Sequence, residues 1–184
     1  MTPSRFQIRA AAKAIKNQGV IAYPTESVFG LGCLPLSEPS VLKLLQLKCR
    51  PIEKGLILIA SELEQLEQFT LLSDTDRKKI NTQSTPTTWL VNKSVLTPEW
   101  ISGKHKKVAV RVSKHPVVST LCNEVGGAIV STSANKSTAK AATSLLQVRQ
   151  YFPVELDYYL GGETGEIVSA TPIIDIETMR IIRN

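Results

Sequence analysis

The sequence predicts a single α/β domain, in which helices flank a twisted, mixed β-sheet. Its 184 residues are enough to bury one core, and its hydrophobic fraction of 42% and charged fraction of 21% are globular values. Residues 56–60 (LILIA) form a continuous apolar run, typical of a strand buried on both faces. Residues 107–112 alternate instead, so that Val108 and Arg111 fall on opposite faces of a strand. Helical stretches separate these strands without strict alternation, which favours a mixed sheet.

The first predicted elements are a helix and a strand. Residues 5–18 have apolar side chains at helical spacing, and Gly19 supplies the stop. Residues 20–23 then form a short buried strand, which leads into a polar turn bounded by Gly30 and Gly32. The apolar stripe of the helix is expected to consist of Phe6, Ala10, Ala14 and Ile15.

Capping residues predict where the next helices begin. Ser37 is the expected N-cap of a helix that Pro51 ends. Ser61 and Glu64 have the spacing of a capping box, which predicts a second helix in this part of the chain. Ser73 is expected to open a third.

The remaining elements continue the same alternation. Helices are expected at residues 98–101 and 116–125, and Thr143 is expected to cap a further one. Besides residues 107–112, strands are expected at residues 85–91, 128–130, 156–160, 173–176 and 179–182.

Composition and charge exclude several classes of protein. No apolar run approaches the ~20 residues that span a bilayer, and the N-terminus has no apolar signal region, so a soluble cytoplasmic protein is expected. Cys33, Cys49 and Cys122 form no C-x-x-C pair, so neither a zinc site nor a disulfide framework is predicted. The net charge of +6 favours polyanionic partners such as nucleotide phosphates or RNA.

Polar groups gather at three places where a regular element ends. Residues 25–27 (TES) and 131–135 (STSAN) each follow a strand, and the pair Lys48 and Arg50 ends a helix. Ligands collect at such edges in open α/β sheets. Lysine and arginine supply positive charge for phosphates, while Ser, Thr and Asn supply neutral donors and acceptors. These residues predict a cleft for an anionic ligand.

Each of these groups also has a simpler interpretation. Lys48 and Arg50 would then only cap a helix C-terminus. Arg111, which otherwise projects into the same cleft, would be a surface residue on an edge strand. Residues 131–135 would be a turn whose hydroxyls satisfy their own backbone. The chain has no P-loop, G-x-G-x-x-G, H-E-x-x-H or G-x-S-x-G motif to decide between these readings.

Four blocks of the sequence resemble the signature blocks of the YrdC/TsaC family, the threonylcarbamoyl-AMP synthases. They occur in the family's order and cover nearly the whole chain, whose length is that of the short bacterial form. Any one block is weak evidence, but four in order are specific. The blocks are residues 23–32 (YPTESVFGLG), 48–51 (KCRP) with 54–56 (KGL), 108–111 (VAVR) and 131–135 (STSAN).

The resemblance implies a fold and a reaction. The fold is a single YrdC-like domain over residues 1–184, with a concave, positively charged cavity. The enzyme is a nucleotidyltransferase that joins L-threonine, bicarbonate and ATP to give threonylcarbamoyl-AMP and pyrophosphate. Mg2+ would arrive on the ATP, without a tightly bound protein metal site. Partner proteins would then transfer the threonylcarbamoyl group to adenosine 37 of tRNAs that read codons starting with A.

The resemblance also implies roles for individual residues. Lys48 and Arg50 would be catalytic and would hold the ATP phosphates. At one position the chain departs from the family's pattern, since Ile59 stands where longer family members have a histidine. The resemblance gives Glu26 and Ser27 no role beyond shaping a turn. The further ATP contacts implied are Lys54, Ser133, Asn135 and Arg183. The threonine contacts implied are Thr25, Arg111, Ser131 and Thr171.

A rival hypothesis comes from a different class of function. The basic charge balance and the positive surface expected from the resemblance also suit a module that binds double-stranded RNA or tRNA directly, and that acts in RNA maturation without catalysis. The rival predicts a salt dependence of RNA affinity spread over many dispersed lysines and arginines.

Overall fold

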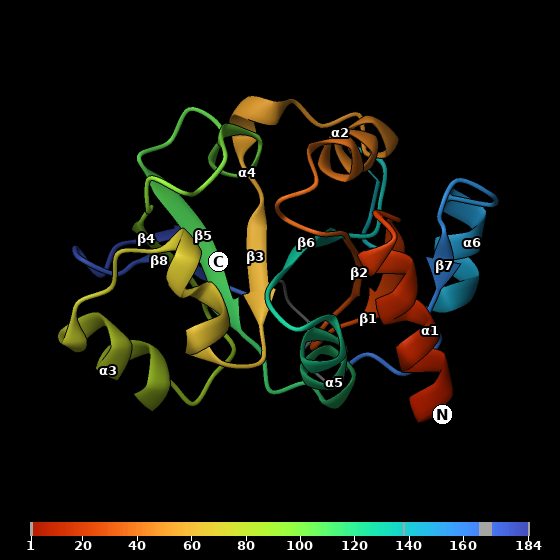
Figure 1. Ribbon diagram of the computed structural model, residues 1–184, viewed down its shortest axis with the longest axis horizontal. Helices are drawn as coiled ribbons and strands as arrows, with labels where there is room; N and C mark the ends of the chain where they lie inside the picture. The colour runs from red at the N-terminus through yellow and green to blue at the C-terminus, as the bar shows by residue number, and fades with distance from the viewer. Residues whose placement is uncertain (1, 138, 166–170, 184) are drawn as a thin grey trace.

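The computed structural model describes residues 2–137, 139–165 and 171–183. Their strands are β1 (Ile21–Pro24), β2 (Phe29–Gly32), β3 (Ile57–Ala60), β4 (Thr88–Asn92), β5 (Lys107–Val112), β6 (Ile129–Ser133), β7 (Tyr158–Tyr159), β8 (Ile173–Asp175) and β9 (Ile181–Arg183). They form a nine-stranded sheet in the order β7-β1-β2-β6-β3-β5-β4-β8-β9 (Figure 1). The pairs β1/β7, β3/β5 and β4/β8 are parallel and the others antiparallel, so the predicted mixed α/β sheet is confirmed.

Helices flank this sheet (Figure 1). The α-helices are α1 (Arg5–Lys16), α2 (Glu38–Leu47), α3 (Asp74–Thr82), α4 (Glu99–Ser102), α5 (Pro116–Val125) and α6 (Leu145–Tyr151). Two 3-10 segments, η1 (Ile52–Lys54) and η2 (Leu63–Phe69), complete the list. Within the described part of the chain, no helix has the length and apolar character needed to cross a membrane.

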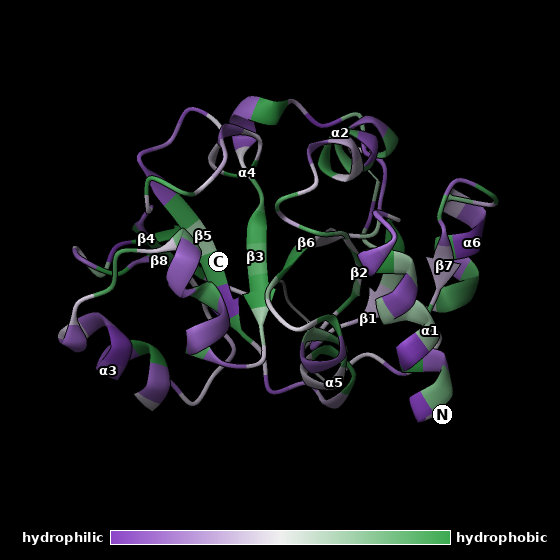
Figure 2. Cartoon of the chain, viewed as in Figure 1, coloured by the Kyte–Doolittle hydropathy of each residue, from purple (hydrophilic) through white to green (hydrophobic). Residues whose placement is uncertain are grey.

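The inner strands β1 and β3 are buried on both faces of the sheet, because their successive residues belong to different apolar clusters. In β3, Leu58 lies in the larger cluster and Ile59 in the smaller one. In β1, Ala22 and Tyr23 divide in the same way, as the period of two in a strand requires. The side chains of α1 and α5 meet in the smaller cluster. Figure 2 shows β3 as a hydrophobic strand at the centre, which confirms the prediction for residues 56–60.

The first helix is present, but its predicted apolar face is confirmed only at Ile15, which is fully buried. Phe6 is 81% exposed, whereas Ile8 and Ala11 face the core together with Ala12 and Ile15. The expected stripe took its phase from Phe6. The observed face, Ile8, Ala11, Ala12 and Ile15, has the i, i+3, i+4, i+7 spacing of an amphipathic helix, so the sequence contains it and the prediction missed it by starting from Phe6.

Two of the predicted caps are also corrected. No capping box forms at Ser61, whose hydroxyl donates to Asn123 Oδ1 at 2.6 Å; the 3-10 segment η2 follows with Glu62 as its N-cap. The helix expected after Thr143 is capped by Ser144 instead. The predicted helix start at Ser73 is confirmed, and its hydroxyl accepts a hydrogen bond from the Asp76 backbone N–H at 3.2 Å in a capping box.

The polar stretch after β1 is a tight hairpin turn, and the residues after it form a strand. Residues 29–32, expected to end a turn, form β2 and pair with both β1 and β6. Gly32 permits this close approach, because a Cβ atom there would lie 2.7 Å from the Val130 carbonyl oxygen. Strand β6 runs to Ser133, so Ser131 is part of the sheet and not of a turn. The other predicted strands are present with shifted ends.

Candidate functional site

A cavity of about 670 Å³ lies where the β1–β2 turn, the segment around η1, β5, β6 and the C-terminal hairpin meet. This volume is in the range of small-molecule sites. The fold brings together all of the predicted site residues except Lys48 and Asn135 along its wall. Those lining it are Thr25, Arg50, Lys54, Arg111, Ser131, Ser133, Thr171 and Arg183.

One part of the cavity has unpaired cations. Arg50 donates to the Gly55 carbonyl through Nε at 3.3 Å and Nη2 at 2.8 Å. Burial lowers the pKa of Arg50, and repulsion from Arg183 lowers it further. No carboxylate of the described residues pairs with either guanidinium. Their charge is therefore available to an anionic ligand such as a phosphate.

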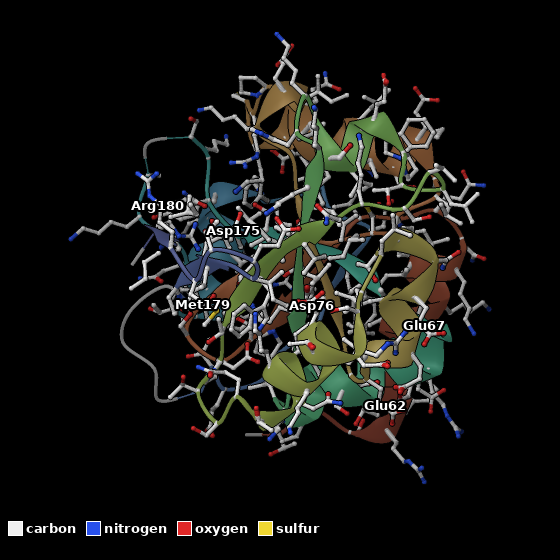
Figure 3. The ribbon with its side chains drawn as sticks, turned by 90° about the vertical axis from the view of Figure 1, so that its left-hand side faces the viewer. Glu62, Glu67, Asp76, Asp175, Met179 and Arg180 are labelled. Atoms are coloured by element: carbon white, nitrogen blue, oxygen red, sulfur yellow. The ribbon has the colours of Figure 1, made fainter. Side chains whose placement is uncertain are left out.

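The C-terminal hairpin of β8 and β9 carries Arg183 to the cavity. Lys107 Nζ on β5 pairs with Asp175 Oδ2 on β8 at 2.7 Å and so fastens the hairpin to the body of the sheet. Figure 3 shows Asp175, Met179 and Arg180 close together on this hairpin. Arg183 itself donates to the carbonyl of the preceding loop, at Thr171 O, across 3.2 Å.

Arg111 occupies a second, buried part of the cavity. It is 7% exposed, its Nε donates to Thr88 Oγ1 at 3.1 Å, and its Nη1 lies 3.6 Å from Glu26 Oε2. Burial lowers the pKa of Arg111, while attraction to Glu26 opposes that change. Since β5 lies between β3 and β4, the interpretation of Arg111 as a surface residue on an edge strand is wrong.

Glu26 is a residue of the site that the sequence left without a role. It is 7% exposed, its Oε1 accepts a hydrogen bond from the Ser113 hydroxyl, and its Oε2 faces Arg111 without forming a hydrogen bond in the described residues. The sequence offered one signal, a carboxylate directly after a buried strand. Its partner Ser113 is 87 positions away, so the pairing itself is not visible locally.

Lys48 lies behind the cavity wall, buried under the loop that follows β6. Its amino group donates to the Ser133 carbonyl, to Asn135 O at 3.0 Å and to Asn135 Oδ1 at 3.1 Å. Its own carbonyl accepts from the Ser137 N–H at 3.1 Å. Burial lowers the pKa of Lys48 to about 8, with repulsion from Arg50 as a smaller cause.

Lys48 and Arg50 therefore do more than cap a helix. The Lys48 side chain bonds to the loop after β6, and the Arg50 side chain bonds to Gly55 and Lys54, so neither reaches the last carbonyls of α2. The simpler interpretation of this pair is wrong.

The two serine hydroxyls of β6 differ in their partners, since Ser131 has one outside the segment 131–135 and Ser133 has one inside it. Tyr23 donates to Ser131 Oγ at 2.8 Å, and Ser133 donates to Asn135 Oδ1 at 2.6 Å. Opposite them, Thr25 Oγ1 donates to the Val28 carbonyl at 2.7 Å. Residues 131–133 belong to strand β6 and Ser131 bonds to Tyr23, so the interpretation of residues 131–135 as a turn that satisfies its own backbone is wrong, although Ser133 and Asn135 do bond to each other.

Ile59 packs where longer relatives were expected to place a histidine. It pairs in register with Arg111 on the neighbouring strand and lies fully buried in the smaller apolar cluster. Cys33 and Cys122 are buried and Cys49 is exposed, all three as free thiols. Among the described residues, no group of three or more His, Cys, Asp or Glu side chains could hold a metal ion.

Comparison with protein families identifies the chain. The model of the Sua5/YciO/YrdC family, described as telomere recombination, matches residues 13–184. The chain belongs to this family. A relative named threonylcarbamoyl-AMP synthase from Cellvibrio japonicus is 44% identical over 96% of this chain and 95% of its own length. A relative of the same name from Pseudomonas aeruginosa strain UCBPP-PA14 is 46% identical over 98% of both chains.

Solved structures agree with this membership. The crystal structure of P. abyssi Sua5 complexed with L-threonine matches with a TM-score of 0.87 and 29% identity over 94% of this chain. The match spans about half of that protein, 51% of its length. The crystal structure of E. coli YciO matches over 100% of this chain and 91% of its own, with a TM-score of 0.86. At 21% identity, the YciO match supports the fold alone.

Proposed function

We propose that this protein is a threonylcarbamoyl-AMP synthase, a nucleotidyltransferase that joins L-threonine, bicarbonate and ATP. The proposal rests on the name shared by relatives that are 44–46% identical over nearly the whole chain. The observation of the structure that supports it is one cavity with two kinds of cation. Arg50, Lys54 and Arg183 have no acidic partner among the residues that the structure describes, while Arg111 is buried and paired with Glu26.

The proposed chemistry needs positioning and positive charge. The amine of threonine takes up bicarbonate to form a carbamate and releases water. A carbamate oxygen then attacks the α-phosphorus of ATP, and pyrophosphate leaves. Negative charge accumulates on the phosphate oxygens in the transition state, so fixed cations accelerate the step. No enzyme nucleophile is required, and Mg2+ arrives with the triphosphate without a protein cage of its own.

The proposal takes its residue roles from the resemblance and is supported by the position of these side chains on the cavity wall. In this proposal, Arg50, Lys54 and Arg183 contact the phosphates and Ser133 contacts the nucleotide. Lys48 and Asn135 hold the loop that begins at Ser133, so in this proposal they act on ATP through that loop. The amino acid is held by Thr25, Arg111, Ser131 and Thr171, with Arg111 taking its carboxylate.

The wider assignment is part of the same proposal. Residues 1–184 act as one YrdC-like domain whose cavity is basic, and partner proteins pass the product's threonylcarbamoyl group to adenosine 37 of tRNA. The rival, an RNA-binding module without catalysis, is not favoured, since the relatives carry an enzyme's name.

The test measures pyrophosphate release by the pure protein. The protein is incubated with ATP, Mg2+ and bicarbonate, with and without L-threonine, beside a related synthase as the positive control. Threonine-dependent release is expected. Its absence under conditions where the control works would refute the proposal. L-serine in place of threonine should support slower release, because one methyl group contributes only ~1–3 kcal/mol to discrimination.

A further inference from the structure

Tyr23 is a buried phenol directly behind the cavity wall. It is 0% exposed, and its hydroxyl donates to Ser131 Oγ at 2.8 Å. Two glycines make room for its ring. A Cβ atom at Gly32 would lie 2.8 Å from Tyr23 Cε1, and one at Gly30 would lie 3.2 Å from its Cζ. The Y-x-x-x-x-x-x-G-x-G spacing of β1 and β2 therefore serves to seat this phenol against Ser131.

The direction of this hydrogen bond decides what Ser131 offers to a ligand. A neutral phenol has one proton to donate, and burial raises the pKa of Tyr23, so the phenol keeps that proton. Ser131 Oγ accepts it, which leaves the Ser131 proton to point elsewhere. No acceptor for that proton exists among the described residues, and Ser131 lines the cavity. Ser131 thus faces the ligand as a donor.

Thr25 has the opposite polarity. Its hydroxyl proton is used by the Val28 carbonyl at 2.7 Å, so only the lone pairs of Oγ1 remain for a ligand. Thr25 also lines the cavity. The two hydroxyls are alike in sequence, but one is fixed as a donor and the other as an acceptor by the partner that each has inside the protein.

This polarity matches an α-amino acid in one orientation. The amino nitrogen carries hydrogens, and it keeps one after conversion to a carbamate, so it suits Thr25. The carboxylate carries only acceptors, so it suits Ser131 together with Arg111. Arg111 and Ser131 line the same cavity, so one carboxylate there has both as donors. Resting on the function proposed above, we propose that Tyr23 is a positioning residue that commits Ser131 to donate to the amino-acid carboxylate.

The test is Tyr23→Phe, with Tyr159→Phe as the matched control. Tyr159 also donates its hydroxyl within the protein, to the Phe152 carbonyl, but lies outside the cavity. Tyr23→Phe should raise the KM for L-threonine and its calorimetric Kd about 3- to 10-fold, the range of one net hydrogen bond. The KM for ATP should change less than about twofold, and Tyr159→Phe should change neither constant by more than that.

A double-mutant cycle separates positioning from a general structural effect. If Tyr23 acts through Ser131, the variant Tyr23→Phe/Ser131→Ala should bind threonine as Ser131→Ala does. The inference would be overturned if the fold-increases in the Kd for threonine caused by Tyr23→Phe and Ser131→Ala multiplied in the double variant. It would also be overturned if Tyr23→Phe raised the KM for ATP as much as the KM for threonine. Denaturant midpoints of all variants check that each one folds.

Calorimetric measurement of threonine binding keeps the test of Tyr23 separate from the test of the proposed reaction by pyrophosphate release. Threonine binding by the wild-type protein without pyrophosphate release would refute the proposed function, while the cycle in Kd would still test Tyr23. A wild-type protein that does not bind threonine would overturn the role of Tyr23 itself.

Discussion

Arg50 and Arg111 line the same cavity, but the protein holds them in different ways. Arg50 is half-buried, bonds to the Gly55 carbonyl, and has Arg183 as its charged neighbour. Arg111 is buried and bonds to Thr88 while Glu26 balances its charge. A guanidinium without a counter-ion suits a polyanion that brings its own negative charge. A neutralised and fixed guanidinium suits the orientation of one small carboxylate.

The difference teaches that the charge of a site residue does not by itself reveal its task. Both arginines were expected to contact substrate from their place in the sequence blocks. The partners of the two arginines lead to different expectations for stability. Removal of the Arg50 guanidinium should be tolerated, whereas removal of the Arg111 guanidinium should destabilise the fold. The predictions below are ordered by the size of the effect expected.

The largest effect is expected from Arg111→Leu. Removal of this guanidinium leaves the Glu26 carboxylate buried without a counter-ion, which should cost about 3–5 kcal/mol of unfolding free energy in urea denaturation. The double variant Glu26→Gln/Arg111→Leu should recover a large part of that loss, because a neutral amide still accepts the Ser113 hydrogen bond. If the double variant is as unstable as the single one, the two groups do not act as a pair.

Lys48 tests a third arrangement, a buried cation bonded only to neutral oxygens. Its pKa is lowered from 10.5 to about 8 in the folded protein, so between these pH values the unfolded chain binds more protons. Lys48 should therefore contribute an unfolding free energy that rises with pH from about 8 to 10.5, by up to roughly 3 kcal/mol. Burial raises the pKa of the Cys33 and Cys122 thiols to about 12, which lowers the unfolding free energy above about pH 9 in the wild-type protein and in Lys48→Met alike. The difference in unfolding free energy between the two proteins, measured by urea denaturation across this range, should therefore rise with pH. Parallel pH profiles for both proteins would contradict the prediction.

The smallest effect on stability is expected from Arg50→Leu. Since no described carboxylate depends on Arg50, unfolding should change by less than about 1 kcal/mol. Under the proposed function, kcat/KM for ATP should fall about tenfold or more, the equivalent of one charged hydrogen bond, with the KM for threonine nearly unchanged. Steady-state pyrophosphate assays at varied ATP provide the measurement. A loss of stability as large as that of Arg111→Leu would remove the contrast between the two regions.

Sequence patterns were sufficient for the α/β class and for most of the elements. The central apolar run of residues 56–60, the alternation of residues 107–112 and the helix start at Ser73 depend on neighbours a few positions away. Such short-range relations can be recognised from the sequence without knowledge of the fold. The same holds for the four blocks that led to the family, since they too are local strings.

Tertiary structure alone decided the side-chain partners. The position of Lys48 depends on the loop after β6, and the role of Glu26 depends on Ser113 and Arg111. The hydroxyls of Ser131 and Thr25 have the same hydrogen-bonding capacity, but their partners inside the protein differ. Ser131 accepts from Tyr23 and can donate to a ligand, whereas Thr25 donates to the Val28 carbonyl and can only accept from a ligand. A hydrophobic pattern of period two or 3.6 indicates which face of a strand or helix is buried. The residues that contact this face come from distant segments of the chain, and only the folded structure determines which segments these are.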